Sequence, residues 1–272
     1  MFEENLPHWT LTALQAAVAA SEKIMSFYSG EFGAAHKEDG SPVTQADLAS
    51  NDILLTHLQQ TGIPIVSEES VHSAYEIRKD WELVWCVDPL DGTKEFIRGS
   101  SEFAVCVSLI HEQSPILGII ASPVQRTILI GGISVPAAFL NFDSIHEPKR
   151  WRYIDRREQV NEPLVIAISR SQDSNSDLAF NRRMRDRYGK VEFLKKGSAL
   201  KFMDLASGQA DVYARYAPTM EWDIAAGQAI IEALGGRVVH AEKGHALYYN
   251  KANLFNPYFI VETAPVLTSP EI

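Results

Sequence analysis

Apolar residues recur every three or four positions in two stretches near the N-terminus. They form one stripe across residues 11–29, and Gly30 follows directly, so the pattern predicts an amphipathic helix that ends there. Residues 46–58 have the same spacing and predict a second helix. Between the two helices, the Gly-Ser-Pro sequence within residues 37–42 predicts a turn.

Runs of consecutive apolar residues come next and predict strands. Residues 63–67 make a short run, and residues 83–88 are apolar up to a final aspartate, which is typical of a buried strand. Three further runs, at residues 103–111, 116–121 and 127–131, alternate in character and are separated by turn residues. We therefore expect an antiparallel meander in this part of the chain.

The pattern changes over residues 142–163, a charged stretch with four arginines and two prolines. We place a subdomain boundary here and expect the arginines to form a solvated surface. Residues 1–160 would be a helix-plus-antiparallel-sheet subdomain, and residues 161–272 an α/β subdomain with helices packed on a sheet. The expected strands of the second half are residues 164–169, 191–194 and 211–215, and its expected helices are residues 177–188, 199–207 and 224–234. The predicted class is a layered α/β (α+β) fold.

Composition narrows the possible functions. The chain has 272 residues, 46% of them hydrophobic, with a formal net charge of -10. An acidic protein is a poor general binder of nucleic acid, because phosphates attract Lys and Arg. A small phosphorylated substrate stays possible, since bound metal ions can reverse the local charge.

The length of the apolar segments and the number of cysteines indicate in which cellular compartment the protein is expected. No segment reaches the roughly 18 apolar residues that a membrane span requires, and the acidic N-terminus does not read as a signal peptide. Cys86 and Cys106, the only cysteines, lie in apolar runs and are expected to be reduced core residues. We expect a cytoplasmic protein without an integral membrane segment. Peripheral contact with the inner face of the membrane, and assembly as monomer or homodimer, stay open.

Two carboxylates, Asp88 and Asp91, stand three residues apart at the end of the buried strand. Acids in such a place repel each other and lose solvation, so they stay ionised only when positive charge lies between them. Divalent cations with oxygen ligands supply that charge most simply. The turn therefore predicts a metal site.

Three other places carry acids beside apolar runs: Glu68 and Glu69 after a strand, Asp223 before a helix of small residues, and Asp47 at the start of the second helix. Each has a simpler explanation when taken alone. Asp47 and Asp223 would serve as helix caps or first-turn acids, and the glutamates as loop charges. Their combination with Asp88 and Asp91 favours a common site, which the sequence does not place in space.

Three motifs resemble those of the inositol monophosphatase superfamily, a group of metal-dependent, lithium-sensitive phosphatases. Residues 67–70 resemble its (G/S)EE element, residues 88–93 its DP(I/L)DGT motif and residues 222–227 its WDxAAG signature. The resemblance covers almost the whole chain and implies an αβαβα sandwich. Residues 39–47, 91–97, 169–171 and 197–202 further resemble segments of the CysQ-type 3′(2′),5′-bisphosphate nucleotidases.

The resemblance implies metal ligands at matching positions. One Mg²⁺ would be held by Glu68, Asp88 and the backbone carbonyl of Leu90. A second would be held by Asp88, Asp91 and Asp223. Glu68 would reach a weaker third ion through water, so that two or three ions take part.

The resemblance also implies the residues that act on water and phosphate. Thr93 and Asp47 would orient and deprotonate the attacking water, with Glu68 as a further catalytic residue through the third ion. The amides of Gly92 and Thr93, at the start of an expected helix, would donate hydrogen bonds to phosphate oxygens.

The implied substrate is 3′-phosphoadenosine 5′-phosphate, with its 5′-phosphosulfate relative as a second candidate. Inositol monophosphatases carry a glutamate where this chain has Tyr216, preceded by Arg215. Tyr216 could pack on the adenosine and Arg215 could meet an extra phosphate, or the two could be ordinary core and surface residues. Lys196, Gly197 and Ser198 are further candidates for the far phosphate or the adenosine.

One pair of residues, Met220 and Glu221, departs from the apolar or amide-rich segment expected before the WD motif. The charge of Glu221 would alter the edge of the expected substrate pocket, and Asp223 keeps its predicted role as a metal ligand. An inositol or sugar phosphatase of the same superfamily stays an alternative. So does a non-catalytic metal or nucleotide sensor, although Asp47 and Thr93 count against it. Zinc hydrolase chemistry is disfavoured because none of the eight histidines forms an HExxH motif.

Overall fold

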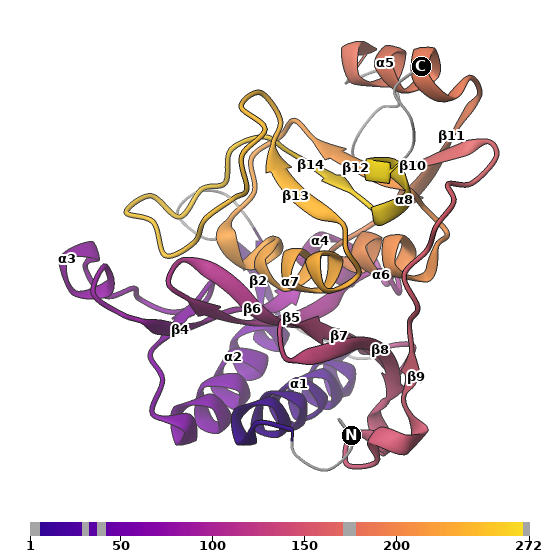
Figure 1. The fold of residues 1–272 in the computed structure, drawn as a ribbon. Helices are drawn as coiled ribbons and strands as arrows, with labels where there is room; N and C mark the ends of the chain where they lie inside the picture. The colour runs from indigo at the N-terminus through magenta and orange to yellow at the C-terminus, as the bar shows by residue number, and fades with distance from the viewer. Residues whose placement is uncertain (1–5, 29–32, 37–41, 171–177, 269–272) are drawn as a thin grey trace.

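Helices and sheets alternate in five layers (Figure 1). The structure is a computed structural model that describes residues 6–28, 33–36, 42–170 and 178–268. In order, the layers are α1 (His8–Phe27) with α2 (Gln45–Leu58), a seven-stranded sheet, α6 (Leu200–Ser207) with α7 (Ala225–Ala233), a five-stranded sheet, and α5 (Leu178–Tyr188). The short α8 (Ala264–Thr268) lies beside α6 and α7. The αβαβα arrangement implied by the family resemblance is confirmed. Within the described residues, no helix has the length and apolar character needed to cross a membrane.

The seven-stranded sheet is the predicted meander. Its strands, in spatial order, are β3 (Ile65–Ser67), β4 (Leu83–Asp91), β5 (Ala104–His111), β6 (Ser114–Ser122), β7 (Thr127–Gly132), β8 (Val135–Asn141) and β9 (Arg152–Tyr153). Neighbours pair antiparallel except β3 and β4, which are parallel. The prediction did not include β8, whose Pro136 is a residue that normally counts against a strand.

The five-stranded sheet belongs to the second half of the chain. Its spatial order is β11 (Val191–Lys196), β10 (Leu164–Ser169), β12 (Val212–Arg215), β14 (Phe259–Glu262) and β13 (Arg237–His240). β10 pairs in parallel with β11 and β12, whereas β14 pairs antiparallel with β12 and β13. The alternating strands and helices up to α7 were predicted, and the last two strands, each of four residues, were not.

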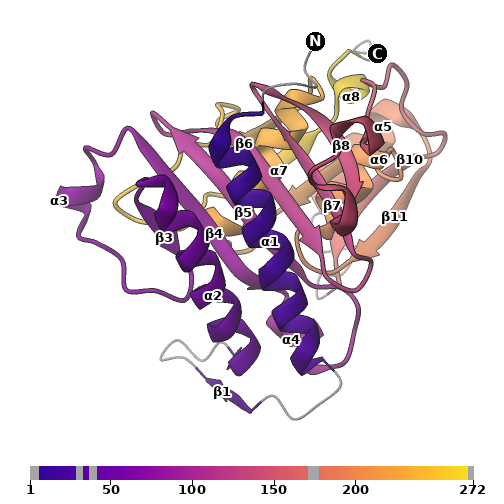
Figure 2. The same ribbon diagram turned by 90° about the horizontal axis from the view of Figure 1, so that it is seen from below.

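Burial on both faces explains the continuous apolar run of β4. Val84 and Cys86 pack in the core between the two sheets, whereas Trp85 and Val87 pack in the core under α1 and α2. Successive side chains of a strand point to opposite faces, so a sheet covered on both sides needs apolar residues at every position. Figure 2 shows α1 and α2 side by side across this sheet. Both cysteines are buried and free, as expected.

The connector between the sheets is less exposed than predicted. The Arg157 side chain is only 26% exposed, and its Nη1 donates to Oδ1 of the fully buried Asp211 at 3.2 Å. The backbone amides of Asn161 and Val165 donate to the same carboxylate at 3.0 and 2.8 Å. Arg157 therefore holds the connector to the second sheet, while Arg150, Arg152 and Arg156 are exposed, as predicted. The division of the chain at residue 160 stays a prediction.

Three expectations lie partly outside the described residues. They are the end of the first helix at residues 29–30, the turn over residues 37–42, of which only Pro42 is described, and the first residue of the helix expected over 177–188. Three small helical segments complete the part near the site: α3 (Tyr75–Arg78), α4 (Thr93–Ile97) and the 3-10 turn η4 (Glu221–Asp223).

Candidate active site

A β-bulge at the end of β4 brings Asp88 and Asp91 together. In a regular strand, residues three positions apart face opposite sides of the sheet. Here Asp88 pairs with Cys106 and Asp91 with Ala104, so three steps along β4 match two steps along β5. The extra residue re-aims the second side chain, which is a common role of bulges beside functional sites.

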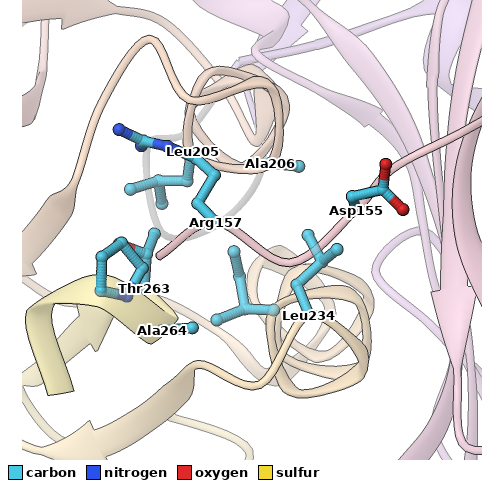
Figure 3. A pocket seen from close by; sticks show the side chains of 9 residues that line it. Asp155, Arg157, Leu205, Ala206, Leu234, Thr263 and Ala264 are labelled. Carbon is cyan, nitrogen blue, oxygen red and sulfur yellow. The ribbon is translucent and has the colours of Figure 1, made fainter. Parts of the chain in front are cut away.

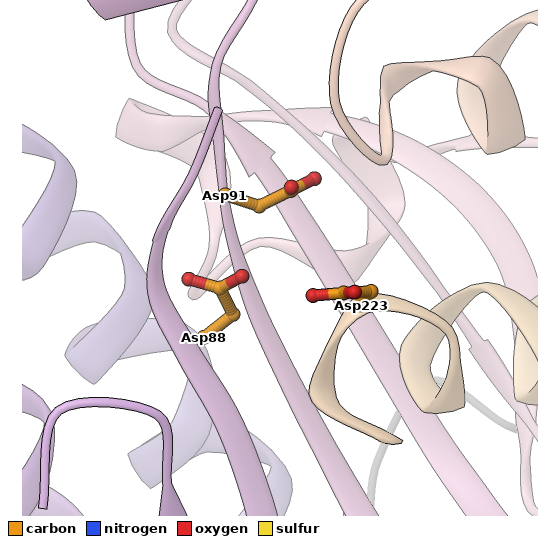
Figure 4. A group of neighbouring side chains, drawn as sticks. All are labelled: Asp88, Asp91 and Asp223. Atoms are coloured by element: carbon orange, nitrogen blue, oxygen red, sulfur yellow. The ribbon is translucent and has the colours of Figure 1, made fainter. Parts of the chain in front are cut away.

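Asp223 joins this pair from the other half of the chain (Figure 4). It ends η4, immediately before α7, and its carboxylate points toward the two aspartates of β4. Ligand oxygens of Asp88, Asp91 and Asp223 all lie within 4.8 Å of one another. We call these three residues the acidic cluster.

Hydrogen bonds hold one oxygen of each carboxylate in the acidic cluster. The Leu90 amide donates to Asp88 Oδ1 at 2.9 Å, and the Met220 amide donates to Asp223 Oδ2 at 2.8 Å. The Asp91 Oδ2 atom accepts a bond from the Ser198 hydroxyl at 2.7 Å and another from the Ala199 amide. The cluster is thus fixed in place by both halves of the chain.

The acidic cluster holds more negative charge than its surroundings balance. Burial raises the pKa of Asp88 well above its ordinary value, and the charges of Glu68 and Asp91 raise it further. Glu68 also shares a hydrogen bond with Asp88. The pKa of Asp223 is raised by burial and then by Asp91. Oxygen ligands that repel one another in this way fit a divalent cation of the Mg²⁺ or Ca²⁺ type.

Asp47 and Thr93, the pair expected to act on water, are hydrogen-bonded to each other. The Thr93 hydroxyl donates to Asp47 Oδ1 at 2.8 Å and lies 3.3 Å from the carbonyl oxygen of Leu90. Thr44, at the end of β2 (Pro42–Thr44), donates to Asp47 Oδ2 through its amide at 2.8 Å and its hydroxyl at 2.5 Å. This capping box at the start of α2 fixes Asp47 beside the turn that carries Leu90.

A cavity of about 350 Å³ opens beside the acidic cluster, between α4, the ends of β10 and β12, and the turn from β11 to α6. Among the residues predicted to bind substrate, its lining includes Gly92, Gly197, Ser198, Arg215 and Asp223. The described lining also carries five cationic side chains, those of Lys94, Arg98, Arg170, Lys201 and Arg215. Gly92 is required here because its φ is 101° and a Cβ atom would lie 3.0 Å from the carbonyl oxygen of Glu102.

Tyr216 and Lys196, both predicted to bind substrate, lie away from this lining. The Tyr216 ring packs against Phe180 and Tyr258, with ring centroids 6.5 and 5.9 Å apart. The Lys196 ammonium lies 3.9 Å from a carboxylate oxygen of Asp204. Their neighbour Arg215 does reach the cavity, where its Nη1 donates to the Ser169 hydroxyl at 2.8 Å.

The sequence reasoning missed an ion pair behind the cavity. Glu102 accepts two hydrogen bonds from Arg170, through Nε and Nη2, and a third from the Gly197 amide at 2.7 Å. These bonds, with Arg170 as the largest cause, lower the pKa of Glu102. The only signal in the sequence was an acid at the start of the apolar run that becomes β5.

One of the other cavities is far smaller and does not resemble a substrate site. It has about 20 Å³ and lies between the connector, α6 and α8, beside Arg157, Leu205 and Ala264 (Figure 3). That volume holds one water molecule at most.

Comparison with known proteins gives a consistent result. A model of the inositol monophosphatase family matches residues 5–265. The chain is 36% identical over 257 residues to the 3′(2′),5′-bisphosphate nucleotidase CysQ of Salmonella typhimurium, covering 91% of this chain and 96% of that protein. It is 28% identical over 258 residues to the protein of the same name from Haemophilus influenzae, covering 93% and 92% of the two chains.

Solved structures give the same likeness. The crystal structure of CysQ from Bacteroides thetaiotaomicron superimposes with a TM-score of 0.83 at 34% identity, covering 96% of this chain and 99% of that one. The extragenic suppressor protein suhB from Bartonella henselae superimposes with a TM-score of 0.73 at 22% identity, covering 95% and 94%. The second likeness is one of fold.

Proposed function

The chain belongs to the inositol monophosphatase family, and from this premise we propose that it is a metal-dependent phosphomonoesterase that removes the 3′-phosphate of 3′-phosphoadenosine 5′-phosphate. The products are AMP and inorganic phosphate. The corresponding 5′-phosphosulfate is a second substrate. The relatives named CysQ, which match over nine-tenths of the chain, carry the name of this activity.

One observation carries the proposal more than any other. Asp91 and Asp223 of the acidic cluster line a 350 Å³ cavity whose described lining also carries five cationic side chains. A substrate with one phosphate and a neutral ring needs the metal side alone. A bisphosphate nucleotide uses both sides, because its second phosphate requires positive charge at a distance from the metal.

The acidic cluster fits two or three Mg²⁺ ions. Asp88, Asp91 and Asp223 would hold them, together with Glu68 and the carbonyl oxygen of Leu90, which lies beside Thr93. Bound Mg²⁺ neutralises phosphate oxygens and makes water a better nucleophile. The protein's part is to hold these ligand residues beside the cavity before substrate arrives.

Asp47 and Thr93 would handle the proton of the attacking water. Because the Thr93 hydroxyl donates to Asp47, its oxygen lone pairs are free to accept a hydrogen bond from water. The proton can then pass to Thr93 as Thr93 passes its own to Asp47. Thr44 keeps the Asp47 carboxylate in the orientation that this relay needs.

The cationic side of the cavity would bind the second phosphate. Arg215 and Arg170 reach the lining from the ends of β12 and β10. The Gly197 amide and Arg170 both donate to Glu102, and the Ser198 hydroxyl donates to Asp91. Tyr216 is not part of this proposal, because its ring packs against Phe180 and Tyr258.

Phosphate release from three substrates, with and without Mg²⁺, tests the proposal. We expect 3′-phosphoadenosine 5′-phosphate to be hydrolysed faster than its phosphosulfate relative, and both far faster than inositol 1-phosphate. All activity should disappear when a chelator removes the metal. Preference for inositol 1-phosphate would overturn the assignment of the cationic side, and activity that survives the chelator would overturn the metal site.

A further inference from the structure

Residues 250–256, here called the clasp segment, wrap around the turn that carries Asp223. The clasp segment lies in the irregular connection between β13 and β14, opposite the 219–223 turn. Met220 and Phe255 form an antiparallel bridge, and the Glu221 amide donates to the Leu254 carbonyl at 3.0 Å. The Asn256 side-chain amide donates to the Met220 carbonyl at 2.5 Å. Met220 in turn holds the Asp223 carboxylate through its own amide.

Glu221 is the centre of these contacts. Its side chain is 2% exposed and accepts three hydrogen bonds from the clasp segment. The Asn250 amide donates to Oε2 at 2.6 Å, and the Lys251 amide and ammonium donate to Oε1 at 3.1 and 2.5 Å. The Lys251 side chain is itself only 13% exposed. The buried Glu221 carboxylate, two residues before the expected metal ligand Asp223, is thus paired with the nearly buried ammonium of Lys251.

Arg78 anchors the clasp segment from the opposite side. Its guanidinium is buried and donates to the Asn250 side-chain oxygen at 2.6 Å and to the Lys251 carbonyl at 3.0 Å. The Asn250 side-chain amide returns a bond to the Arg78 carbonyl at 2.6 Å. Arg78 ends the segment that follows Glu68 along the chain. The clasp segment is therefore fixed to the first half of the molecule at one end of this network and to η4 at the other.

We propose that Glu221 and Lys251 are positioning residues that set the affinity of the acidic cluster for its divalent cation, by fixing η4 and with it the Asp223 carboxylate. This inference rests on the proposed metal-dependent function and adds two residues to it. Glu221 and Lys251 do not touch the reacting atoms. They act through Met220, whose amide holds Asp223 only while the clasp segment holds η4.

The physical reason is the cost of an unpaired buried charge. When Lys251 is replaced by an uncharged residue, Glu221 keeps the hydrogen bonds from the Asn250 and Lys251 amides. It loses the ammonium, the one cation with which the clasp segment pairs it. The charged carboxylate then gains by moving toward water, and η4 moves with it. Residues that orient metal ligands from behind typically change metal affinity by about ten- to a hundred-fold when replaced.

Metal binding without substrate tests the proposal. Mn²⁺, which takes the same oxygen ligands, is titrated into the metal-free protein of residues 1–272, and its dissociation constant is compared among the wild type, Lys251→Met, Lys251→Arg and Glu221→Gln. The matched control is Lys243→Met, which changes an exposed lysine of the same β13–β14 connection. Thermal unfolding of each metal-free protein is recorded in parallel.

We expect Lys251→Met and Glu221→Gln to weaken Mn²⁺ binding by about tenfold or more, and Lys251→Arg to recover most of that loss. Phosphate release should need correspondingly more Mg²⁺ for half-maximal rate, while kcat at saturating Mg²⁺ changes less than the metal requirement. Lys243→Met should match the wild type in every measurement.

Unchanged Mn²⁺ affinity in folded Lys251→Met and Glu221→Gln proteins would overturn the proposal. So would equal weakening in Lys251→Met and Lys251→Arg. If Lys251→Met does not fold, the Glu221→Gln and Lys251→Arg proteins still decide the matter. Because the probe is the metal alone, a wrong substrate assignment would appear in the phosphate assay and leave this titration readable.

Discussion

Carboxylates at two places around the cavity have opposite neighbours, and their pKa values shift in opposite directions. On one side, the buried Asp88 and the half-buried Asp223 lie next to other acids, and the pKa of each lies well above its ordinary value. On the other side, Glu102 lies behind Arg170 and Gly197, and its pKa is lowered. The protein supplies a cation to Glu102 and surrounds the aspartates with acids. The aspartates are where an external cation has to bind.

Burial alone does not distinguish the two kinds of acid. Asp211 is fully buried, yet Arg157 and two backbone amides bind its carboxylate, so it serves the fold. The difference lies in the neighbours: Asp88 has Glu68 and Asp91 beside it. A cluster of acids that raise one another's pKa is therefore better evidence for a metal site than any single buried acid.

The largest effect is expected for Asp88→Asn, which removes one carboxylate from the acidic cluster. We expect phosphate release with Mg²⁺ to fall by about 10³-fold, as when several kcal/mol of transition-state stabilisation is lost. The metal-free variant should unfold at a higher temperature than the metal-free wild type, because a buried, repelled charge is gone. The exposed Asp52→Asn on α2 is the control. A lower unfolding temperature for Asp88→Asn would contradict the charge balance described here.

Glu102→Gln tests the opposite side and should have a smaller effect. Glutamine keeps the shape and an acceptor for the Gly197 amide, but it loses the charge that holds Arg170. We expect KM for 3′-phosphoadenosine 5′-phosphate to rise about tenfold, with kcat changed less, the size of one lost charge-assisted hydrogen bond. Steady-state kinetics measure both, with the exposed Glu112→Gln as control. A fall in kcat at constant KM would assign Glu102 to the metal side.

The two sides should also respond oppositely to pH in the metal-free protein. The pKa of Glu102 is lowered from 4.5, so its contribution to stability is complete above that pH and is lost as pH falls through the folded-state pKa. The pKa of Asp88 is raised from 3.8, so the folded protein keeps a proton that the unfolded chain releases, and stability falls as pH rises above 3.8.

Urea unfolding at a series of pH values measures these slopes. The stability deficit of Glu102→Gln should shrink toward acid pH, and the stability gain of Asp88→Asn should grow as pH rises. If the free energy of unfolding of both variants depended on pH in the same way as that of the wild type does, the proposed electrostatic difference between Glu102 and Asp88 would be wrong.

Features of the fold and the site that depend on neighbouring residues in the sequence were predictable, and features that depend on contacts between distant residues were not. The layers followed from apolar spacing, because a helix or strand buries its face locally. Asp88, Asp91 and Asp223 were found because each ends or begins an element. The bulge that aligns Asp88 with Asp91 was not predictable, since it depends on the register against β5.

Residues paired across the two halves were the hardest to find. Glu102 and Arg170 are 68 positions apart, and nothing in the local pattern of either residue indicates the other. Tyr216 was predicted to bind substrate because it stands where inositol monophosphatases carry a glutamate, and that position alone does not say where the ring packs. Arg215, the last residue of β12, lines the cavity, while Tyr216, just after the strand, packs against Phe180.

The smallest effect is expected for a change at Ser169, which holds Arg215 at the cavity. The Ser169 hydroxyl accepts a hydrogen bond from Arg215 Nη1 at 2.8 Å and fixes that guanidinium at the cavity. Ser169→Ala should raise KM for 3′-phosphoadenosine 5′-phosphate about threefold, the value of one ordinary hydrogen bond, because Arg215 is less well oriented toward the second phosphate. KM for adenosine 3′-phosphate, which lacks that phosphate, should stay unchanged, so the comparison of the two substrates is its own control. An equal rise for both substrates would mean that Arg215 acts on the metal side, through the charge by which it already lowers the pKa of Asp223.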